Sequence, residues 1–150
     1  MMDMTLMGSW EQLTVTGRRD AILQLESEMK AHEDEQGIEI PPVEYMCNGI
    51  YAREITIPKG VALVGEIHLQ DQINVVSQGV IRVFTEEGAK TITAPSTFIS
   101  PAGTKRAGYV LEDTVWTVFH ATTSTDVEVI KKEFIAPDYK ALDKHLESDV

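Results

Sequence analysis

The sequence lacks the features on which several common classes of site depend. It has a single cysteine, Cys47, so an internal disulfide and a multi-cysteine zinc site are both excluded. Neither of the glycine-rich phosphate-binding patterns, GxGxxG and GxxxxGKS/T, occurs in it, and no serine lies in a nucleophile elbow. A disulfide scaffold, a nucleotide-binding loop and a serine hydrolase are therefore not supported.

Basic residues and long apolar runs are also scarce. Lysine and arginine number 13 against 24 aspartate and glutamate residues, which gives a net charge of −11. A chain this acidic is repelled by a phosphate backbone, so we do not expect a nucleic-acid partner. No apolar run approaches the roughly 18 residues of a membrane span, and the N-terminal segment MMDMTLMGSW has no signal-peptide pattern. We therefore expect a cytoplasmic protein without a membrane partner.

The N-terminal part of the chain predicts an arm, one amphipathic helix and a linker. From Arg18 to Gln36, apolar residues recur at spacings of three and four, and Gly37 supplies a stop. The apolar stripe is narrow, which favours docking on a sheet face or on a partner subunit. Pro41-Pro42 then favours an extended linker over residues 38–43.

The rest of the chain predicts antiparallel strands. Short runs rich in Val, Ile, Thr and aromatic residues alternate with Gly, Pro, Asn or acidic turns, which is typical of a closed or double-sheet barrel. A C-terminal helix follows at Asp138–Glu147. With 150 residues we expect one globular unit, divided into residues 1–44 (arm, helix and linker), 45–136 (barrel) and 137–150 (helical tail). The expected strands are Gly49–Ile57, Val61–Leu69, Gln72–Ser77, Val80–Thr85, Thr91–Ile92, Thr97–Ile99, Ala107–Leu111, Thr114–Thr122 and Val127–Phe134.

Two short stretches have a distinctive spacing. From Gly60 there are five residues, then Glu66, one residue, His68, three residues, Gln72, six residues and a glycine. Further along, the segment Pro-Ala-Gly is followed by two residues and Arg106. These two frames resemble the two sequence motifs of the cupin superfamily, over roughly residues 51–121.

The cupin resemblance implies an all-β fold, a cupin-type double-stranded β-helix or jelly-roll barrel, here with an N-terminal amphipathic helix and a short C-terminal helix. It also implies four inward-pointing metal-ligand positions, which are two histidines, a glutamate and a third histidine. In this chain they are occupied by Glu66, His68, Gln72 and Arg106. Gln72 is a weak neutral ligand and Arg106 is permanently positive, so the resemblance predicts a degenerate metal site.

The substituted positions favour a pocket for a small polar or anionic ligand. Arg106 would be the anion anchor, His68 and Gln72 its hydrogen-bonding partners, and Glu66 the residue that holds Arg106 in place. His120 could complete the pocket, with Trp116, on the same strand face, as a stacking wall. The alternative is a structural ion pair between Glu66 and Arg106 in a barrel that binds nothing, with His120 as a core residue.

The sequence also resembles the small stand-alone cupin proteins of tailed bacteriophages and prophages. We expect a non-catalytic binding or interaction protein of phage origin, present in the host cytoplasm or in the virion, and forming a homodimer. One alternative is a metal-dependent cupin oxygenase or sugar isomerase, in which His68 and Glu66 ligate Fe, Mn or Zn with His120 as a replacement ligand. Another is a structural component of a virus particle.

Overall fold

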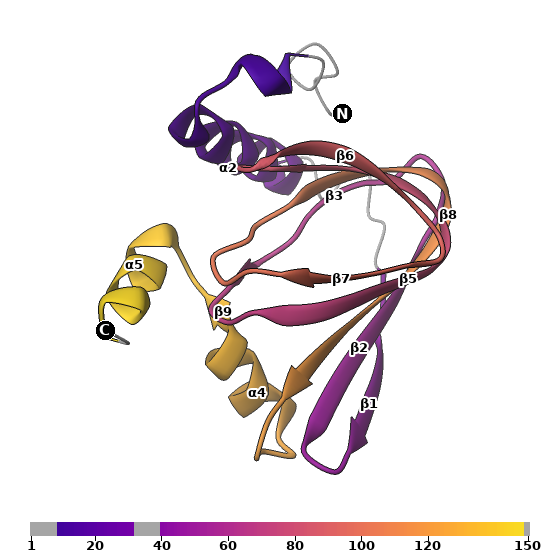
Figure 1. The fold of residues 1–150 in the computed structure, drawn as a ribbon, viewed down its shortest axis with the longest axis vertical. Helices are drawn as coiled ribbons and strands as arrows, with labels where there is room; N and C mark the ends of the chain where they lie inside the picture. The colour runs from indigo at the N-terminus through magenta and orange to yellow at the C-terminus, as the bar shows by residue number, and fades with distance from the viewer. Residues whose placement is uncertain (1–8, 32–39, 149–150) are drawn as a thin grey trace.

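The computed structural model describes residues 9–31 and 40–148 of the chain. A helical N-terminal part is followed by a run of antiparallel strands and then by a mainly helical C-terminal part (Figure 1). The elements are η1 (Trp10–Gln12), α2 (Val15–Ala31), β1 (Val43–Cys47), β2 (Ile50–Ile57), β3 (Ala62–Val64), β4 (Ile67–His68), β5 (Gln72–Thr85), β6 (Gly88–Thr93), β7 (Ser96–Ser100), β8 (Ala107–Ala121), α4 (Val127–Phe134), β9 (Ile135–Ala136) and α5 (Tyr139–Ser148).

Two long antiparallel strands, β5 and β8, organise the sheet. They pair with each other along most of their length in the order β1-β2-β8-β5-β6, with β3 beside β8 and β7 beside β5. Residues 72–76 of β5 pair with β7, whereas residues 80–85 pair with β6. Similarly, β2 pairs with residues 114–121 of β8 and β3 with residues 107–109. Each long strand therefore passes from one layer to the other, and the two layers face each other (Figure 1).

The passage between layers occurs at a bend centred on Gly79. The register of β5 against β8 shifts at several steps between Val76 and Ile81, as expected where a bulge bends a strand. Gly79 has a φ of +93°. A β-carbon there would lie 2.2 Å from the carbonyl oxygen of Asp113 and 2.5 Å from Oγ1 of Thr114. Only glycine allows the two strands to approach this closely at the bend.

The core lies between the two layers and follows from the alternation of side chains along the strands. On each side of the bend, side chains of β5 and β8 alternate between inward and outward, and the inward positions include branched aliphatic residues and one tryptophan. The buried members of this cluster are Ile57, Val76, Ile81, Val83, Ile92, Val110 and Trp116.

Helix α2 covers the outer side of the layer formed by β3 and β6 (Figure 1). Ile22 and Leu25 are buried against Phe84, and Nζ of Lys105 lies 3.0 Å from each carboxylate oxygen of Glu26. Of the two expected roles for this helix, docking on a sheet face is therefore the one observed. The expected end of the helix, at Gln36 and Gly37, lies outside the described residues. None of the helices within residues 9–31 and 40–148 is both long and apolar enough to cross a membrane.

The all-β class is confirmed, but one expected strand is wrong. Val127–Phe134 forms helix α4, whose buried or half-buried residues Val127, Ile130 and Phe134 recur at helical spacing. Asp126 caps this helix, because its side chain accepts a hydrogen bond from the N–H of Glu128. Local β propensity was thus overridden by the helical period and the cap.

The other strand boundaries also differ in detail. Two long strands were each expected as two shorter ones. Strand β5 covers the expected strands 72–77 and 80–85, and β8 covers 107–111 and 114–122, because the bend near Gly79 changes the direction of the strands without ending their pairing. Strand β1 was not expected. It forms because Asn48 and Gly49, with φ values of 46° and 78°, make a two-residue hairpin turn into β2.

Candidate functional site

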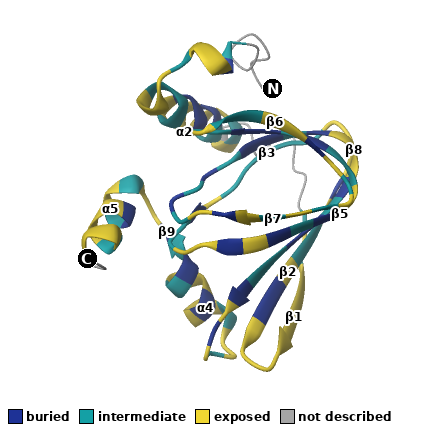
Figure 2. Cartoon of the chain, in the orientation of Figure 1, coloured by how far each residue is buried: buried dark blue, intermediate teal, exposed yellow. Residues whose placement is uncertain are grey.

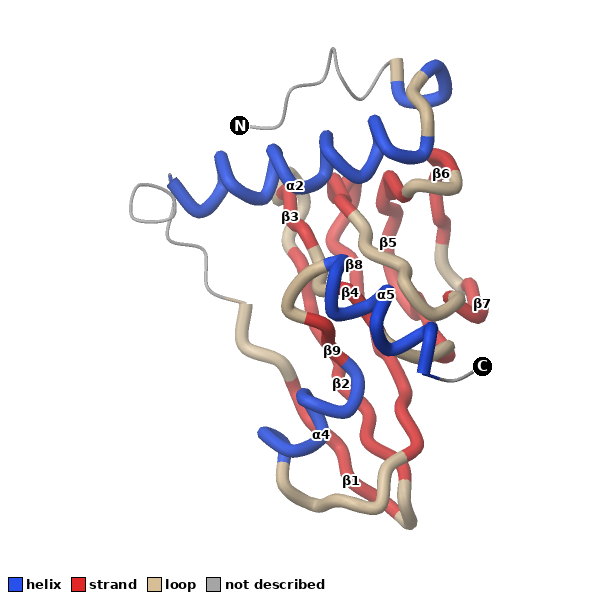
Figure 3. The backbone as a smooth tube through the Cα atoms, turned by 90° about the vertical axis from the view of Figure 1, so that its left-hand side faces the viewer, coloured by secondary structure: helices blue, strands red, loops and turns tan. Residues whose placement is uncertain are grey.

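The candidate site lies at the end of the two layers opposite the Gly79 bend. His68 ends β4, Gln72 begins β5, Arg106 directly precedes β8, and His120 is the penultimate residue of β8. The C-terminal elements α4, β9 and α5 lie across this end of the strands (Figure 3). Residues that are far apart in the sequence therefore meet beneath a cover formed by the last part of the chain.

Arg106 is held by aromatic rings and by a chain of neutral hydrogen bonds. Its guanidinium carbon lies 5.6 Å from the ring centre of Phe98 and 5.3 Å from that of Trp116. Nη2 of Arg106 donates a hydrogen bond to Oγ of Ser100, which also accepts one from Nδ2 of Asn74 at 2.7 Å. Oδ1 of Asn74 accepts from Nε1 of Trp116 at 3.0 Å. These hydrogen bonds fix the position of the guanidinium without neutralising its charge.

The positive charge of Arg106 has no carboxylate partner in the described part of the chain. None of the ion pairs there includes Arg106. Burial lowers its pKa to about 10, so the guanidinium is still charged at neutral pH. Glu66, expected to hold Arg106, is exposed in the loop between β3 and β4 and belongs to none of these ion pairs. The expected ion pair between Glu66 and Arg106 is therefore wrong, and Ser100 accepts the hydrogen bond of Arg106 instead.

Four buried polar atoms near Arg106 have no hydrogen-bond partner among the described residues. They are Nδ1 of His68, Nδ1 of His120, and both amide atoms of Gln72. The rings of His68 and His120 stack with their centres 5.9 Å apart. Gln72 and His120 each lie one residue beyond the paired Ile73 and Phe119, so they are neighbours on the inner face. Because buried polar groups are nearly always hydrogen-bonded, this cluster indicates a site for a polar molecule.

Both histidines are neutral at physiological pH. Burial, followed by the charges of His120 and Arg106, lowers the pKa of His68 from 6.5 to about 4. Burial alone lowers the pKa of His120 to about 4. Neutral imidazoles can each donate one hydrogen bond and accept another. They therefore add hydrogen-bonding capacity to the site without adding charge.

The C-terminal segment closes the site from one side. The ring of Phe134, in α4, stacks on that of His120 with the centres 4.0 Å apart. Strand β9 pairs with β4, and α5 is attached to α2 where Arg19 lies 4.4 Å above the ring centre of Tyr139. We did not expect this cover from the sequence, because Val127–Phe134 was interpreted as a strand.

The structure brings together most of the expected site residues and adds several that were not expected. His68, Gln72, Arg106, Trp116 and His120 share this end of the inner face, whereas Glu66 does not contribute. For three of the additional residues the sequence signal was the alternation along β5 and β7, which places their side chains inward beside Gln72. The fourth, Phe134, comes from helix α4. The additional residues are Asn74, Phe98, Ser100 and Phe134.

The residues present do not fit the metal that the cupin resemblance implies. Within the described ranges, no three His, Cys, Asp or Glu side chains are grouped so that they could hold a metal ion. His68 and His120 are adjacent, but Gln72 is a weak neutral ligand and Arg106 would repel a cation. The chemistry of this donor set is better matched to a negative ligand than to a positive one.

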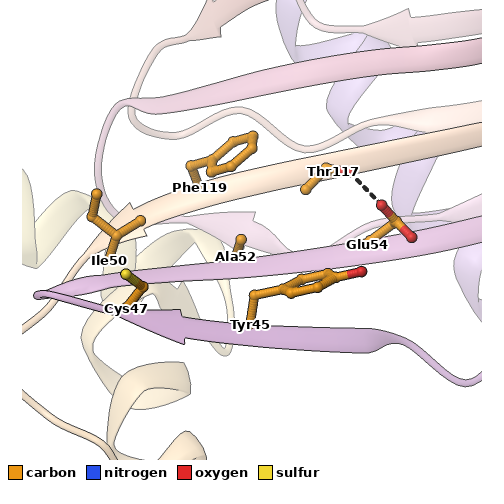
Figure 4. A pocket seen from close by; sticks show the side chains of 7 residues that line it. All are labelled: Tyr45, Cys47, Ile50, Ala52, Glu54, Thr117 and Phe119. Atoms are coloured by element: carbon orange, nitrogen blue, oxygen red, sulfur yellow. Dashed lines mark hydrogen bonds between the residues drawn. The ribbon is translucent and has the colours of Figure 1, made fainter.

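A hollow of about 360 Å³ lies elsewhere, on the outer face of the layer that contains β1 and β2. Ala52 lies at its centre, with Tyr45 on one side and Phe119 on the other (Figure 4). Glu54 is its charged residue, and Thr117 donates to it at 3.5 Å. None of the expected site residues lines this hollow, so it is distinct from the inner site. Its lining residues are Tyr45, Cys47, Ile50, Ala52, Glu54, Thr117 and Phe119.

Comparisons with known proteins find similar folds only. No protein-family model matches the chain, and no curated protein sequence matches it. Among solved structures, KdgF from Halomonas sp. is 21% identical with a TM-score of 0.48, over 59% of this chain and 83% of that one. A cupin-2 domain protein from Shewanella frigidimarina is 12% identical with a TM-score of 0.46, over 62% and 98%. A cupin domain from Bordetella pertussis is 19% identical with a TM-score of 0.45, over 56% and 94%. The similarity to these proteins concerns the fold alone.

Proposed function

We propose that this chain is a binding protein whose interior holds a small anion, with Arg106 as the anchoring charge. The observation that carries this proposal is a partly buried guanidinium, flanked by two aromatic rings, that has no carboxylate partner among the described residues. An unpaired charge removed from water costs several kcal/mol. A bound anion would offset that cost, and the positive charge of Arg106 would hold the anion in place.

The polar atoms around Arg106 narrow the chemistry of the ligand. A guanidinium presents donors in a planar fork that matches a carboxylate, and Ser100 already occupies one Nη2 donor. The free amide atoms of Gln72 and the two free imidazole nitrogens offer further donors and acceptors. These groups suit a small carboxylate that carries a hydroxyl or amide group rather than a simple ion.

The same groups favour binding over catalysis. A general base works best when its pKa is close to the working pH, and His68 and His120 both have a pKa of about 4. They are therefore weak bases at neutral pH. The resemblance of the sequence to phage and prophage cupin proteins supports a phage-derived binder, with sequestration of a small molecule or attachment to a partner as its role.

A thermal-shift series tests the proposal. Wild-type protein and Arg106→Gln are melted with formate, acetate, lactate, succinate, phosphate or sulfate at constant ionic strength. An anion at about 100 times its Kd stabilises a protein by about 2.7 kcal/mol, or roughly 5–10 °C in Tm for a chain of this size. We expect at least one carboxylate to raise the Tm of the wild type and to leave Arg106→Gln unchanged.

The matched control is Arg82→Gln. Arg82 also lies over an aromatic ring, that of Phe84, and donates to the hydroxyl of Thr91, but it lies outside the site. This variant should respond to the anion as the wild type does. An equal response in Arg106→Gln, or no response of the wild type to any of the anions, would contradict the proposal.

A further inference from the structure

The outer face of the layer formed by β1, β2, β8, β5 and β7 carries a continuous apolar row. Directly paired residues on neighbouring strands point to the same face of a sheet. Figure 2 shows exposed positions along β1, β2 and β7. The row crosses all five strands through direct pairs, in the order Tyr45, Ala52, Phe119, Ile73 and Ile99.

Three of the five residues of the row are at least half exposed. Tyr45 is 52% exposed, Ile73 50% and Ile99 69%. The flanking residues Val43 and Ile50, on the same face, are each 50% exposed. An apolar patch of this kind on a globular domain generally marks an interaction surface.

The two halves of the row have complementary shapes. At one end, Ala52 is only 7% exposed and forms the floor of the hollow between Tyr45 and Phe119 (Figure 4). At the other end, Ile73 and Ile99 project from the sheet. A row with a hollow at one end and projecting side chains at the other is complementary to a reversed copy of itself.

We propose that this face binds a second copy of the same chain. A two-fold axis along β8, between two sheets packed face to face, exchanges the two ends of the row because Phe119 lies at its centre. Ile73 of one copy then lies opposite the Ala52 hollow of the other, and Ile99 lies opposite Tyr45. The Ile73–Ala52 and Ile99–Tyr45 contacts each occur twice, as two-fold symmetry requires, and Phe119 meets its own counterpart on the axis. Ile73 is the large residue that meets a small one, because it lies over Ala52 at the floor of the hollow.

Size and charge agree with a second copy as the occupant. Five strands about 4.8 Å apart and three rows of residues along them give an outline of roughly 500 Å², and side-chain relief brings the accessible area towards the ~800 Å² per partner of a standard interface. The chain carries a net charge of −11, so two copies repel each other over most of their surface. Glu54 is the charged residue within the pairs of this face from β1 to β8, which allows close approach here.

The narrow stripe of α2, from which a dimer was expected, does not supply this surface. Ile22 and Leu25 are buried within the same chain against Phe84 and Ala107. The proposed dimer therefore uses the opposite layer of the molecule and leaves α2 and the inner site free.

The test uses two variants that complement each other only in the proposed arrangement. Ile99→Lys and Tyr45→Glu each place a charge opposite an apolar residue of the other copy, and each should raise the dimer dissociation constant about tenfold or more. In an equimolar mixture, the introduced lysine of one copy would meet the introduced glutamate of the other, while the second contact keeps its original Ile99 and Tyr45. Sedimentation velocity over a range of protein concentrations measures the wild type, the two variants and their mixture.

We expect the wild type and the mixture to be dimers, and each variant alone to be a monomer with an unchanged circular dichroism spectrum. Leu111→Lys, at a residue 40% exposed in the other layer, should remain a dimer. Raising the salt concentration should strengthen the dimer, because the interface is apolar and the chains repel each other. A monomeric wild type would assign the face to a different partner and overturn the proposal, as would variants that remain dimers or a mixture that stays monomeric.

Discussion

Arg106 is the residue on which the proposed binding depends, and its surroundings explain why. The residues that fix it are neutral, namely Ser100, Asn74 and two aromatic rings, so its charge persists inside the protein. A carboxylate in place of Ser100 would have neutralised that charge and left a structural ion pair. The interior therefore combines a fixed cation with unpaired donors and acceptors.

His68 and His120 should make the stability of the fold depend on pH. An unfolded histidine has a pKa near 6.5, whereas burial lowers the pKa of His68 to about 4 in the fold. Between these values the unfolded state binds more protons, so the free energy of unfolding falls as the pH drops from about 6.5 towards 4. For His68 the loss should be on the order of 2–3 kcal/mol.

Urea denaturation at pH 7 and at pH 5 measures the larger part of this loss. In His68→Gln the free energy of unfolding should fall less between the two pH values than in the wild type. His120→Gln should show the same direction of change. Identical losses in the wild type and both variants would mean that these histidines titrate normally in the folded protein.

The individual site residues were predictable where the motif spacing included them, or, for Trp116 and His120, where they share a strand face. Arg106, His68 and Gln72 occupy positions of the motif frame, so sequence spacing was enough to group them. Asn74 and Ser100 have no motif of their own and become relevant only when β5 and β7 pair. Glu66 also occupies a position of the motif frame, but β3 ends at Val64 and the loop leaves Glu66 exposed.

The bend of β5 and β8 gives the fold its two layers, and Gly79 should be its most sensitive position. A β-carbon at Gly79 would meet the backbone of Asp113 and Thr114, which cannot move without disturbing β8. Gly79→Ala should lower the free energy of unfolding by on the order of 3–5 kcal/mol.

Gly60→Ala is the matched control for this prediction. Gly60 has a similar φ of +87°, but nothing lies within 4 Å of the position that its β-carbon would take. It should cost only the roughly 1–2 kcal/mol of a left-handed alanine. Urea denaturation compares the two, and equal losses would show that close approach at the bend is unimportant.

Helix α4 protects the histidines from water through Phe134. Replacing this residue by leucine removes the ring stacked 4.0 Å from that of His120 and admits solvent. We therefore expect the pKa of His120 to rise from about 4 towards 6.5, as followed by the NMR signals of its ring protons. Val129→Ala, at an exposed residue of the same helix, should leave that pKa unchanged. An unchanged pKa in Phe134→Leu would contradict the proposed protective role.

Two elements show why local sequence patterns were insufficient here. The segment 127–134 is rich in β-forming residues, and only its cap at Asp126 and its helical period distinguish it from a strand. Strand β1 was obscured by Pro41-Pro42, although Asn48-Gly49 is a strong hairpin signal. In both cases the sequence contained the correct signal, which was the cap and helical period in the first and the hairpin turn in the second. A neighbouring propensity, for strand in the first case and for an extended linker in the second, favoured the wrong assignment.

The whole molecule is strongly acidic around an interior positive charge. A net charge of −11 produces self-repulsion in the compact state, and salt screens that repulsion. The Tm should therefore rise with sodium chloride concentration by the same amount in the wild type and in Arg106→Gln. A rise confined to the wild type would instead indicate chloride bound at Arg106, and no rise in either would mean that the surface charges are already balanced by close pairing.

Fluorescence of Trp116 provides the most direct test of the proposed binding, because its ring lies 5.3 Å from the guanidinium carbon of Arg106. The sequence has two tryptophans, so Trp10→Phe leaves Trp116 as the single reporter. Titrating this protein with lactate, acetate, succinate and phosphate should give a saturable change with at least one carboxylate, and the added substitution Arg106→Gln should abolish it. An unchanged signal with every anion, or the same saturable change without Arg106, would contradict the account.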